Sequence, residues 1–223
     1  MIKNPKRITV FAGHYGSGKT NIAVNYALAV KESFPRVAIA DLYIVNPYFR
    51  TKDSAPILEE KGIDLISSPY ANTNVDVPAL PSETYRIIDD KELYGVIDVG
   101  GDDRGALALG RYSEAILKED YEFLFVINKF RPLTKDAPSC IEVMKEIEDA
   151  CKMKFTGIIN NSNLGELTTP EDVLASFEFA EEVSRLSGIP VRMTTVSSRI
   201  YPSFEDDNIF PIDLYVKQSF MKN

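Results

Sequence analysis

The segment GHYGSGKT, from Gly13 to Thr20, has the residue types and the spacing of a phosphate-binding loop. Gly13, four further residues, and then Gly18, Lys19 and Thr20 satisfy the pattern G-x-x-x-x-G-K-[ST] in full. Glycines allow backbone N–H groups to curve around phosphate oxygens, a lysine reaches the outer phosphates, and a threonine hydroxyl binds Mg²⁺. The segment therefore predicts a site for a nucleoside triphosphate and Mg²⁺.

Two aspartates at the ends of apolar runs are candidates to complete this site. Asp41 ends the run VAIAD, and Asp98 lies near the end of YGVIDVGG. Carboxylates at the carboxyl ends of parallel strands lie at the sheet edge where ligands bind. We predict that Asp98 helps to hold Mg²⁺ and that Asp41 orients the attacking water. Asp98 to Gly101 also reads D-x-x-G, in which the glycine N–H can contact a γ-phosphate and respond to its loss.

Short apolar runs alternate with helical patterns along the whole chain. The runs predicted to be strands cover residues 7–12, 36–41, 63–67, 94–99, 121–127, 155–160 and 190–194. Several are apolar at successive positions, as in FLFVI, so both faces of the sheet should be buried. We therefore predict a three-layer α/β/α fold with a mainly parallel sheet of about seven strands, formed by a single P-loop nucleotide-binding domain over residues 1–223.

The most clearly marked helix begins at TTPEDV. Thr169 is the expected N-cap, Pro170 takes the first helical position, and the helix is expected to end near Gly188. The tail PIDLYVKQSFMKN is amphipathic, with Ile212 and Tyr215 on its apolar side. We expect this tail to dock on the domain, because its two lysines are too few for stable membrane anchoring.

Composition excludes several classes of function. The net charge of −8 and the pI of about 4.9 argue against nucleic acid as an unaided partner, because phosphate backbones bind basic surfaces. No apolar run approaches the roughly 18 residues of a membrane span, and no signal-peptide pattern is present, so we expect a cytoplasmic protein. Two cysteines and one histidine provide no zinc-binding spacing.

Taken together, these motifs resemble the MinD/ParA branch of P-loop NTPases. The branch includes nitrogenase iron protein, metallocentre-maturation ATPases, and the cobyrinate and dethiobiotin synthetases. The loop Gly13–Thr20, Asp41 in ADLYIVNPYFR, and the segment IDVGGDD follow one another in the family's order over nearly the whole chain. The resemblance implies that they are the Walker A loop, the switch I aspartate and the Walker B/switch II segment.

One position in the loop departs from this branch. The branch commonly reads G-K-G-G-x-G-K-T, and its first lysine reaches the partner's nucleotide across a homodimer. His14 stands at that position, and a histidine is ordinarily mostly neutral at pH 7. His14 either replaces the lysine when protonated or simply lines the loop. The resemblance thus implies a possible homodimer, while the substitution predicts slow turnover.

The segment NKFRP bears on which base is bound. Guanine is usually recognised by N-K-x-D, but Arg131 stands at the position of the aspartate and has no acceptor. We therefore expect ATP rather than GTP. The segment GIINNSNL resembles the family's base-contacting region, and an asparagine amide suits adenine because it both donates and accepts. Asn161, and next Asn160, are the predicted base contacts; the alternative is that they are turn residues.

These inferences define one predicted site. The predicted catalytic residues are Lys19, Asp41 and Asp98, and the predicted metal-binding residues are Thr20, Asp41 and Asp98. The predicted nucleotide contacts are Gly13, His14, Tyr15, Gly16, Ser17, Gly18, Lys19, Thr20, Asn21, Gly101, Asn160 and Asn161.

The leading prediction of function is a Mg-ATP-binding switch protein that hydrolyses ATP slowly and regulates or loads a protein partner. The alternative is an ATP-dependent small-molecule ligase or kinase of the cobyrinate/dethiobiotin synthetase type, and binding without turnover is a third possibility. The chain shows no additional substrate domain, which favours the first. In the segment after Asp41, Tyr48, Phe49 and Arg50 either recognise a client or hold the loop in place.

Overall fold

The computed structural model describes residues 2–42, 51–67, 83–101 and 103–215. Within these residues, eight strands form one sheet in the order β3-β2-β4-β1-β5-β6-β7-β8, and every pair of neighbours is parallel. The strands are β1 (Ile8–Ala12), β2 (Val37–Leu42), β3 (Asp64–Ile66), β4 (Tyr94–Val99), β5 (Tyr121–Ile127), β6 (Gly157–Asn160), β7 (Val191–Ser197) and β8 (Ile209–Ile212).

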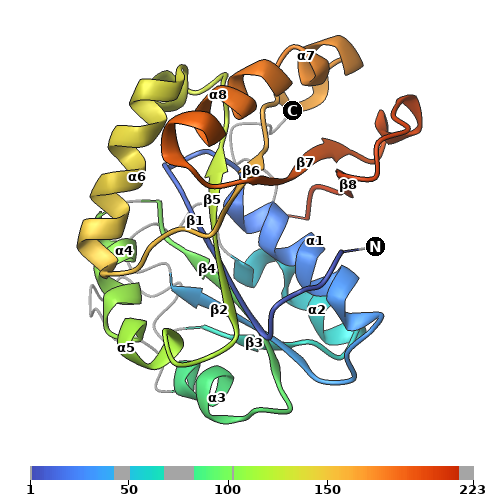
Figure 1. Ribbon diagram of the computed structural model, residues 1–223. Coiled ribbons are helices and arrows are strands. Elements are labelled where there is room, and N and C mark those ends of the chain that lie inside the picture. Colours follow the sequence, from blue (N-terminus) through green and yellow to red (C-terminus); the bar gives the residue numbers. More distant parts are fainter. Residues whose placement is uncertain (1, 43–50, 68–82, 102, 216–223) are drawn as a thin grey trace.

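Helices cover both faces of the sheet (Figure 1). They are α1 (Lys19–Lys31), α2 (Ala55–Glu60), α3 (Thr84–Asp89), α4 (Asp103–Gly110), α5 (Ser113–Ile116), α6 (Ala137–Cys151), α7 (Pro170–Leu174) and α8 (Phe177–Ser187). Among the residues that the structure describes, none of these helices combines the length and apolar character needed to cross a bilayer.

Each face of the sheet buries its own apolar core. Successive residues of a strand point to opposite faces, so Ile8 and Val10 of β1 join one core and Phe11 joins the other. The first core is covered by α3, α4, α5, α6 and α8, and the second by α1 and α2. The predicted three-layer α/β/α fold is therefore confirmed, with an entirely parallel sheet and eight strands rather than about seven.

The helix predicted from Thr169 to Gly188 is in fact two helices, α7 and α8. Its expected beginning is confirmed, because Thr169 forms a capping box with Asp172 and Pro170 opens α7. The break follows from Ser176, whose hydroxyl donates to the carbonyl of Val173 at 2.6 Å and competes with the helical pattern of hydrogen bonds. Gly188 then ends α8 in a left-handed conformation, with φ of 77°.

The carboxyl-terminal segment contains the strand β8 and no helix as far as it is described. Ile212 ends β8, and both Ile212 and Tyr215 pack in the core that contains α1. Asn25 of α1 holds this segment through two hydrogen bonds with the backbone of Asp213, at 2.8 and 2.9 Å. Docking of residues 212–215 on the domain is thus confirmed, and the remainder of the predicted tail lies outside the described residues.

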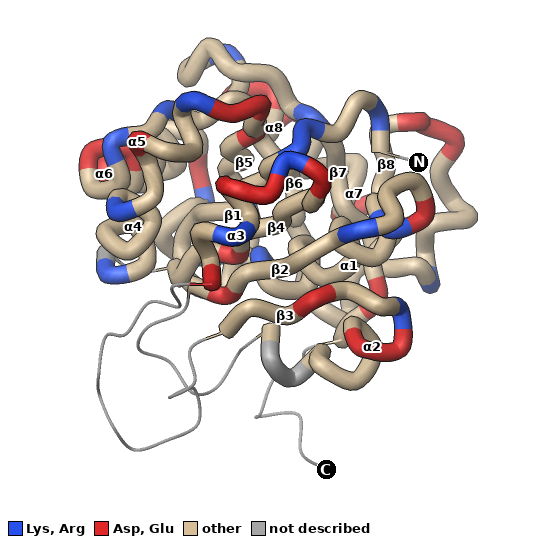
Figure 2. The backbone as a smooth tube through the Cα atoms, turned by 90° about the horizontal axis from the view of Figure 1, so that it is seen from below, with Lys and Arg blue, Asp and Glu red and all other residues tan. Residues whose placement is uncertain are grey.

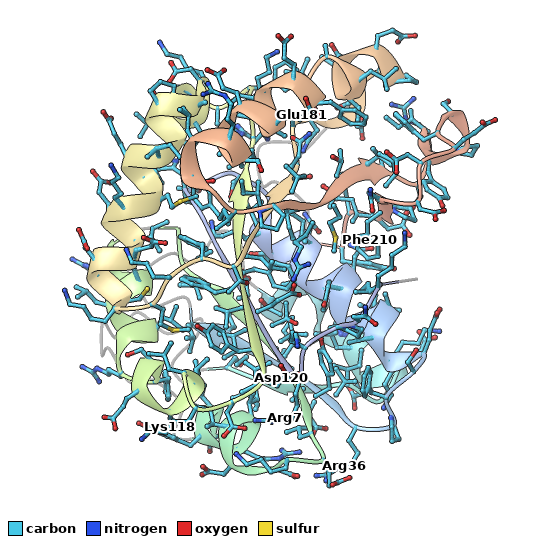
Figure 3. All side chains as sticks on the ribbon, viewed as in Figure 1. Arg7, Arg36, Lys118, Asp120, Glu181 and Phe210 are labelled. Atoms are coloured by element: carbon cyan, nitrogen blue, oxygen red, sulfur yellow. The ribbon has the colours of Figure 1, made fainter. Side chains whose placement is uncertain are left out.

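Charged residues connect neighbouring elements at the edge of the sheet where the strands begin, which is the edge seen in Figure 2. Arg7, labelled in Figure 3 near Asp120, donates to the carbonyls of Ile87 and Ile88 at the end of α3 and to the Glu119 carboxylate at 2.7 Å. Lys91 pairs with the same carboxylate. Hydrogen bonds from Lys91 and Arg7 hold the pKa of Glu119 below its usual range. These contacts tie α3 to the start of β1.

Candidate functional site

The predicted phosphate loop lies between β1 and α1, at the carboxyl end of a central strand. Gly18 precedes α1 with φ of 94°, in the left-handed region that favours glycine. A Cβ at Gly18 would overlap the amide nitrogen of Asn161, so close packing also requires glycine there. The first N–H groups of α1 and its positive dipole end are directed toward the loop, which is the geometry of an anion site.

Main-chain contacts of His14 close the loop. Its carbonyl accepts hydrogen bonds from the ammonium of Lys19 at 3.0 Å and from the backbone N–H of Ser17 at 3.2 Å. Its ring nitrogen Nδ1 lies 2.9 Å from the carbonyl oxygen of Tyr15. Lys19 is thus held beside the loop, at the position from which it would reach a phosphate.

Asp41 and Asp98 are direct neighbours in the sheet. They are register partners of the parallel pair β2 and β4, so their side chains leave the same face at the same height, and both residues are buried. The Oδ2 atom of Asp98 accepts a hydrogen bond of 3.1 Å from the hydroxyl of Thr51. Within the described residues, Oδ1 of Asp98 has no hydrogen-bond partner.

Burial raises the pKa of Asp98, because a charged carboxylate loses its hydration inside the protein. Lys19 and the hydroxyls of Thr20 and Thr51 act in the opposite direction. A fully buried carboxyl with an unpaired oxygen, next to a lysine and a threonine hydroxyl, fits a cation ligand.

Thr51 lies in the candidate site, although the sequence alone offered no reason to expect it there. It begins the 3₁₀ helix Thr51–Ser54, is fully buried, and bonds to Asp98. The threonine was visible in the polar segment after Asp41, but only the folded chain shows that it reaches Asp98. Tyr48, Phe49 and Arg50, expected from the sequence either to recognise a client or to hold the loop in place, lie outside the described residues.

The turn after β4 lies against the phosphate loop. A Cβ at Gly101 would be 2.7 Å from the backbone N of Tyr15 and 2.8 Å from the ammonium of Lys19, so this approach requires glycine. The structure therefore brings together two separate motifs of the predicted site, the loop and the D-x-x-G segment.

Asn160 and Asn161 are both buried at the end of β6, and both are engaged within the protein. Asn160 donates to the hydroxyl of Ser176 at 2.8 Å, and its oxygen accepts from the hydroxyl of Ser162 at 2.7 Å. Asn161 donates to the carbonyl of Ser17 at 2.6 Å. Asn161 therefore braces the phosphate loop, and the base contact expected of these two residues stays a prediction.

Asn21, another predicted nucleotide contact, lies in the first turns of α1. Its side-chain oxygen accepts a hydrogen bond of 3.0 Å from the backbone N–H of Tyr215. Ser17 is buried, and its hydroxyl has no hydrogen-bond partner among the described residues. Tyr15, in contrast, is 43% exposed. The loop thus has one buried polar side and one side open to a ligand or partner.

The residues present fit Mg²⁺ better than a metal held by protein alone. No group of three or more histidine, cysteine, aspartate or glutamate side chains suited to a metal is found in the described parts of the chain. Mg²⁺ commonly takes only one or two carboxylates and completes its octahedron with phosphate oxygens and water. Asp98, Asp41 and the hydroxyl of Thr20 would supply a donor set of this kind.

Comparison with solved structures places this geometry in a known fold. FtsY from Mycoplasma mycoides is 21% identical, with a TM-score of 0.53, over 88% of this chain and 63% of that one. The 54 kDa signal recognition particle protein from Aeropyrum pernix K1, in complex with GDP, is 17% identical, with a TM-score of 0.56, over 86% of this chain and 41% of that one. FtsY from Thermotoga maritima is 19% identical, with a TM-score of 0.56, over 96% of this chain and 68% of that one.

Sequence comparisons gave no closer relative. No protein-family model matches the chain, and no curated protein sequence matches it. The chain spans 63% and 41% of the length of the first two structures, and identities near 20% establish the fold alone. The protein has the three-layer α/β/α fold of P-loop nucleoside triphosphatases.

Proposed function

We propose that the protein is a Mg-ATP-binding switch protein of the MinD/ParA type, which hydrolyses ATP slowly and regulates or loads a protein partner. The observation that carries this proposal is the convergence of Lys19, Asp41 and Asp98 at one end of the central strands. The loop supplies anion-binding N–H groups, and the paired carboxylates supply sites for a cation and a water molecule.

Each residue has a defined task in this proposal. Lys19 exchanges its bond to the carbonyl of His14 for the outer phosphates, and Thr20 and Asp98 hold the metal ion. Asp41 orients the attacking water and accepts its hydrogen bond. When bound, Mg²⁺ neutralises negative charge on the phosphates.

The preference for ATP rests on Arg131. Its guanidinium has five donors and no acceptor, so it cannot replace the aspartate that accepts hydrogen bonds from guanine. Two of the structurally similar proteins are complexes with GDP. That ligand belongs to those proteins and does not establish which base this chain binds. For this chain, titration with both purine triphosphates decides the question, and we expect ATP to bind more tightly than GTP.

The switch character rests on the contact between Gly101 and the phosphate loop. Because Gly101 lies beside Tyr15 and Lys19, loss of a γ-phosphate would alter the packing of the turn after β4. The start of α4 lies directly beyond this turn. A partner that binds this surface would therefore distinguish the triphosphate from the diphosphate form.

Calorimetric titration with Mg-ATP tests the proposal. We expect Lys19→Ala to raise the dissociation constant at least 100-fold. Lys31→Ala is the matched control, because Lys31 ends the same helix and donates to the carbonyl of Pro35, away from the loop. Undiminished affinity in Lys19→Ala contradicts the proposed site. Phosphate release without any added small molecule then supports the switch protein over the ligase.

A further inference from the structure

The side chain of Arg131 lies against the phosphate loop. A Cβ at Gly16 would be 3.6 Å from Nε and 3.7 Å from Cζ of Arg131, which are ordinary van der Waals separations. Among the residues that the structure describes, the buried Nε atom of Arg131 has no hydrogen-bond partner and the side chain forms no ion pair. Arg131 is partly exposed as a whole, but a buried N–H donor without a partner is costly, so its place beside a phosphate loop points to an anionic ligand.

The turn that carries Arg131 is fixed by its own hydrogen bonds. The carbonyl of the buried Asn128 accepts from the backbone N–H of Arg131 at 3.1 Å and from the hydroxyl of Thr134 at 2.8 Å. The side-chain oxygen of Asn128 accepts from the N–H of Phe130 at 3.0 Å. Pro132 follows, and Arg131 has the extended conformation that precedes proline, with φ of −103° and ψ of 134°. These contacts fix the backbone conformation of the turn from which the Arg131 side chain extends.

Arg131 approaches the loop from the flank opposite to the carboxylates. The loop follows β1, which lies between β4 and β5 in the sheet. Asp98 and Gly101 come from the β4 side, where Lys19 also lies. Arg131 comes from the β5 side. In phosphate loops of this pattern the N–H groups cradle the α- and β-phosphates, whereas the lysine reaches the β- and γ-phosphates. The flank of Arg131 is therefore the one nearer to the phosphates that a diphosphate and a triphosphate share.

We propose that Arg131 binds these shared phosphates of the nucleotide, from within the same chain. It provides a permanent positive charge beside a loop whose second residue is His14, and it contributes to affinity for diphosphate and triphosphate alike. Arg131 is in this view a binding residue and takes no part in cleaving the γ-phosphate. The proposal rests on the proposed function, because it requires a nucleotide in the loop.

Lys129 offers a matched control in the same turn. It carries the same charge two residues earlier, but its ammonium donates to the carbonyl of Ala175 at 3.1 Å, near the junction of α7 and α8. Removal of its charge changes the net charge of the protein as Arg131→Gln does, without changing the group that lies on Gly16.

The experiment is calorimetric titration of the wild type, Arg131→Gln, Arg131→Lys and Lys129→Gln with ADP, ATP and GDP in excess Mg²⁺. We expect Arg131→Gln to raise the dissociation constants of ADP and ATP by similar factors, about tenfold, which corresponds to about 1.4 kcal/mol. GDP should lose affinity by the same factor. Arg131→Lys should recover part of the loss, and Lys129→Gln should stay within about twofold of the wild type. Circular dichroism establishes that each variant is folded.

Three outcomes overturn the proposal. If Arg131→Gln and Lys129→Gln have the same dissociation constants for nucleotide, Arg131 contributes nothing to nucleotide binding. If the loss is confined to one purine, Arg131 reads the base, and if it is confined to ATP, Arg131 senses the γ-phosphate. When the wild type binds in a Lys19-dependent manner, each of these results leaves the proposed function intact. Absence of any nucleotide binding by the wild type overturns both.

Discussion

The amide of Asn161 joins the phosphate loop to the far strands of the sheet. Its nitrogen donates to the carbonyl of Ser17 at 2.6 Å, and its oxygen accepts from the hydroxyl of Thr195 in β7 at 2.6 Å. The loop is thus supported by a buried side chain that is itself held in one orientation. Asn161 also packs against Gly18, so the same amide contacts the residue that precedes α1.

Asn161→Asp should weaken nucleotide binding about tenfold or more. The substitution keeps the shape of the side chain but turns a carboxylate oxygen toward the carbonyl of Ser17, so that two acceptors face each other. Titration with Mg-ATP measures the effect. Asn208→Asp, at an exposed position, makes the same chemical change and should bind as the wild type does. Equal affinities of the two variants would show that the brace has no influence on the loop.

His14→Lys should raise the rate of ATP hydrolysis at saturating ATP. A permanent cation at the second position of the loop stabilises the charge that develops on the transferred phosphoryl group. The same variant should promote a nucleotide-dependent dimer, which light scattering detects. His14→Ala should keep the dissociation constant within about threefold, because His14 closes the loop through its main-chain carbonyl.

Steady-state phosphate release by the three proteins distinguishes the two roles of His14. If the wild type is already fast and His14→Ala loses most of that rate, the imidazole itself takes part in catalysis. The prediction of slow turnover limited by a missing cation would then be wrong.

Glu119→Gln should lower stability at neutral pH and have less effect in acid. The pKa of Glu119 is lowered in the folded protein from its usual 4.5, chiefly by Lys91 and then by Arg7. Its stabilising contribution is therefore present above pH 4.5 and is lost as the pH falls through the lowered value. We expect roughly 1 kcal/mol at pH 7, after allowance for solvent screening.

Urea unfolding of the wild type and Glu119→Gln at pH 7 and at progressively lower pH measures this difference. Glu114→Gln is the control, because Glu114 pairs with Lys118 in an exposed i,i+4 pair and should contribute less. A Glu119→Gln deficit that stays constant at every pH would show that the loss comes from packing rather than from the carboxylate charge.

Both cysteines should resist thiol reagents in the native protein. Cys140 and Cys151 are buried, and burial raises the pKa of the Cys140 thiol to about 12 and also raises that of Cys151. At pH 8 very little thiolate is present, so labelling requires the protein to open. Mass spectrometry should find unlabelled protein in buffer and two labels in guanidinium. ATP at 100 times its dissociation constant should slow labelling up to 100-fold. Rapid labelling of the native protein would contradict the buried environment.

The sequence predicted the parts of the fold that depend on local pattern. The apolar runs located seven strands, and Thr169 and Pro170 correctly marked the start of α7. The eighth strand was missed because IFPI is short and contains a proline, which only an edge strand tolerates well. The break at Ser176 depends on a hydroxyl that bonds to Val173 and accepts from Asn160, which is a tertiary contact.

In the candidate site, too, some residues could be predicted from local sequence and others only from tertiary contacts. The loop and the two aspartates carry their chemistry in their residue types, so Lys19, Asp41 and Asp98 could be predicted as site residues from the sequence alone. Thr51 and Arg131 could be placed only by the fold, because their importance comes from the atoms that they approach: a carboxylate of β4 and a glycine of the loop. No local pattern encodes those distances.

The brace between Ser17 and Asn161 has a consequence for the order of events during synthesis. These residues lie 144 positions apart in the chain. At about 5–20 residues per second, the ribosome adds the asparagine roughly 7–30 s after the loop. Thr195, which orients the amide, follows later still. A nascent chain therefore carries a complete phosphate-binding motif long before it can hold that motif rigid. If the loop binds nucleotide as proposed, firm binding would require that synthesis has passed both Asn161 and Thr195.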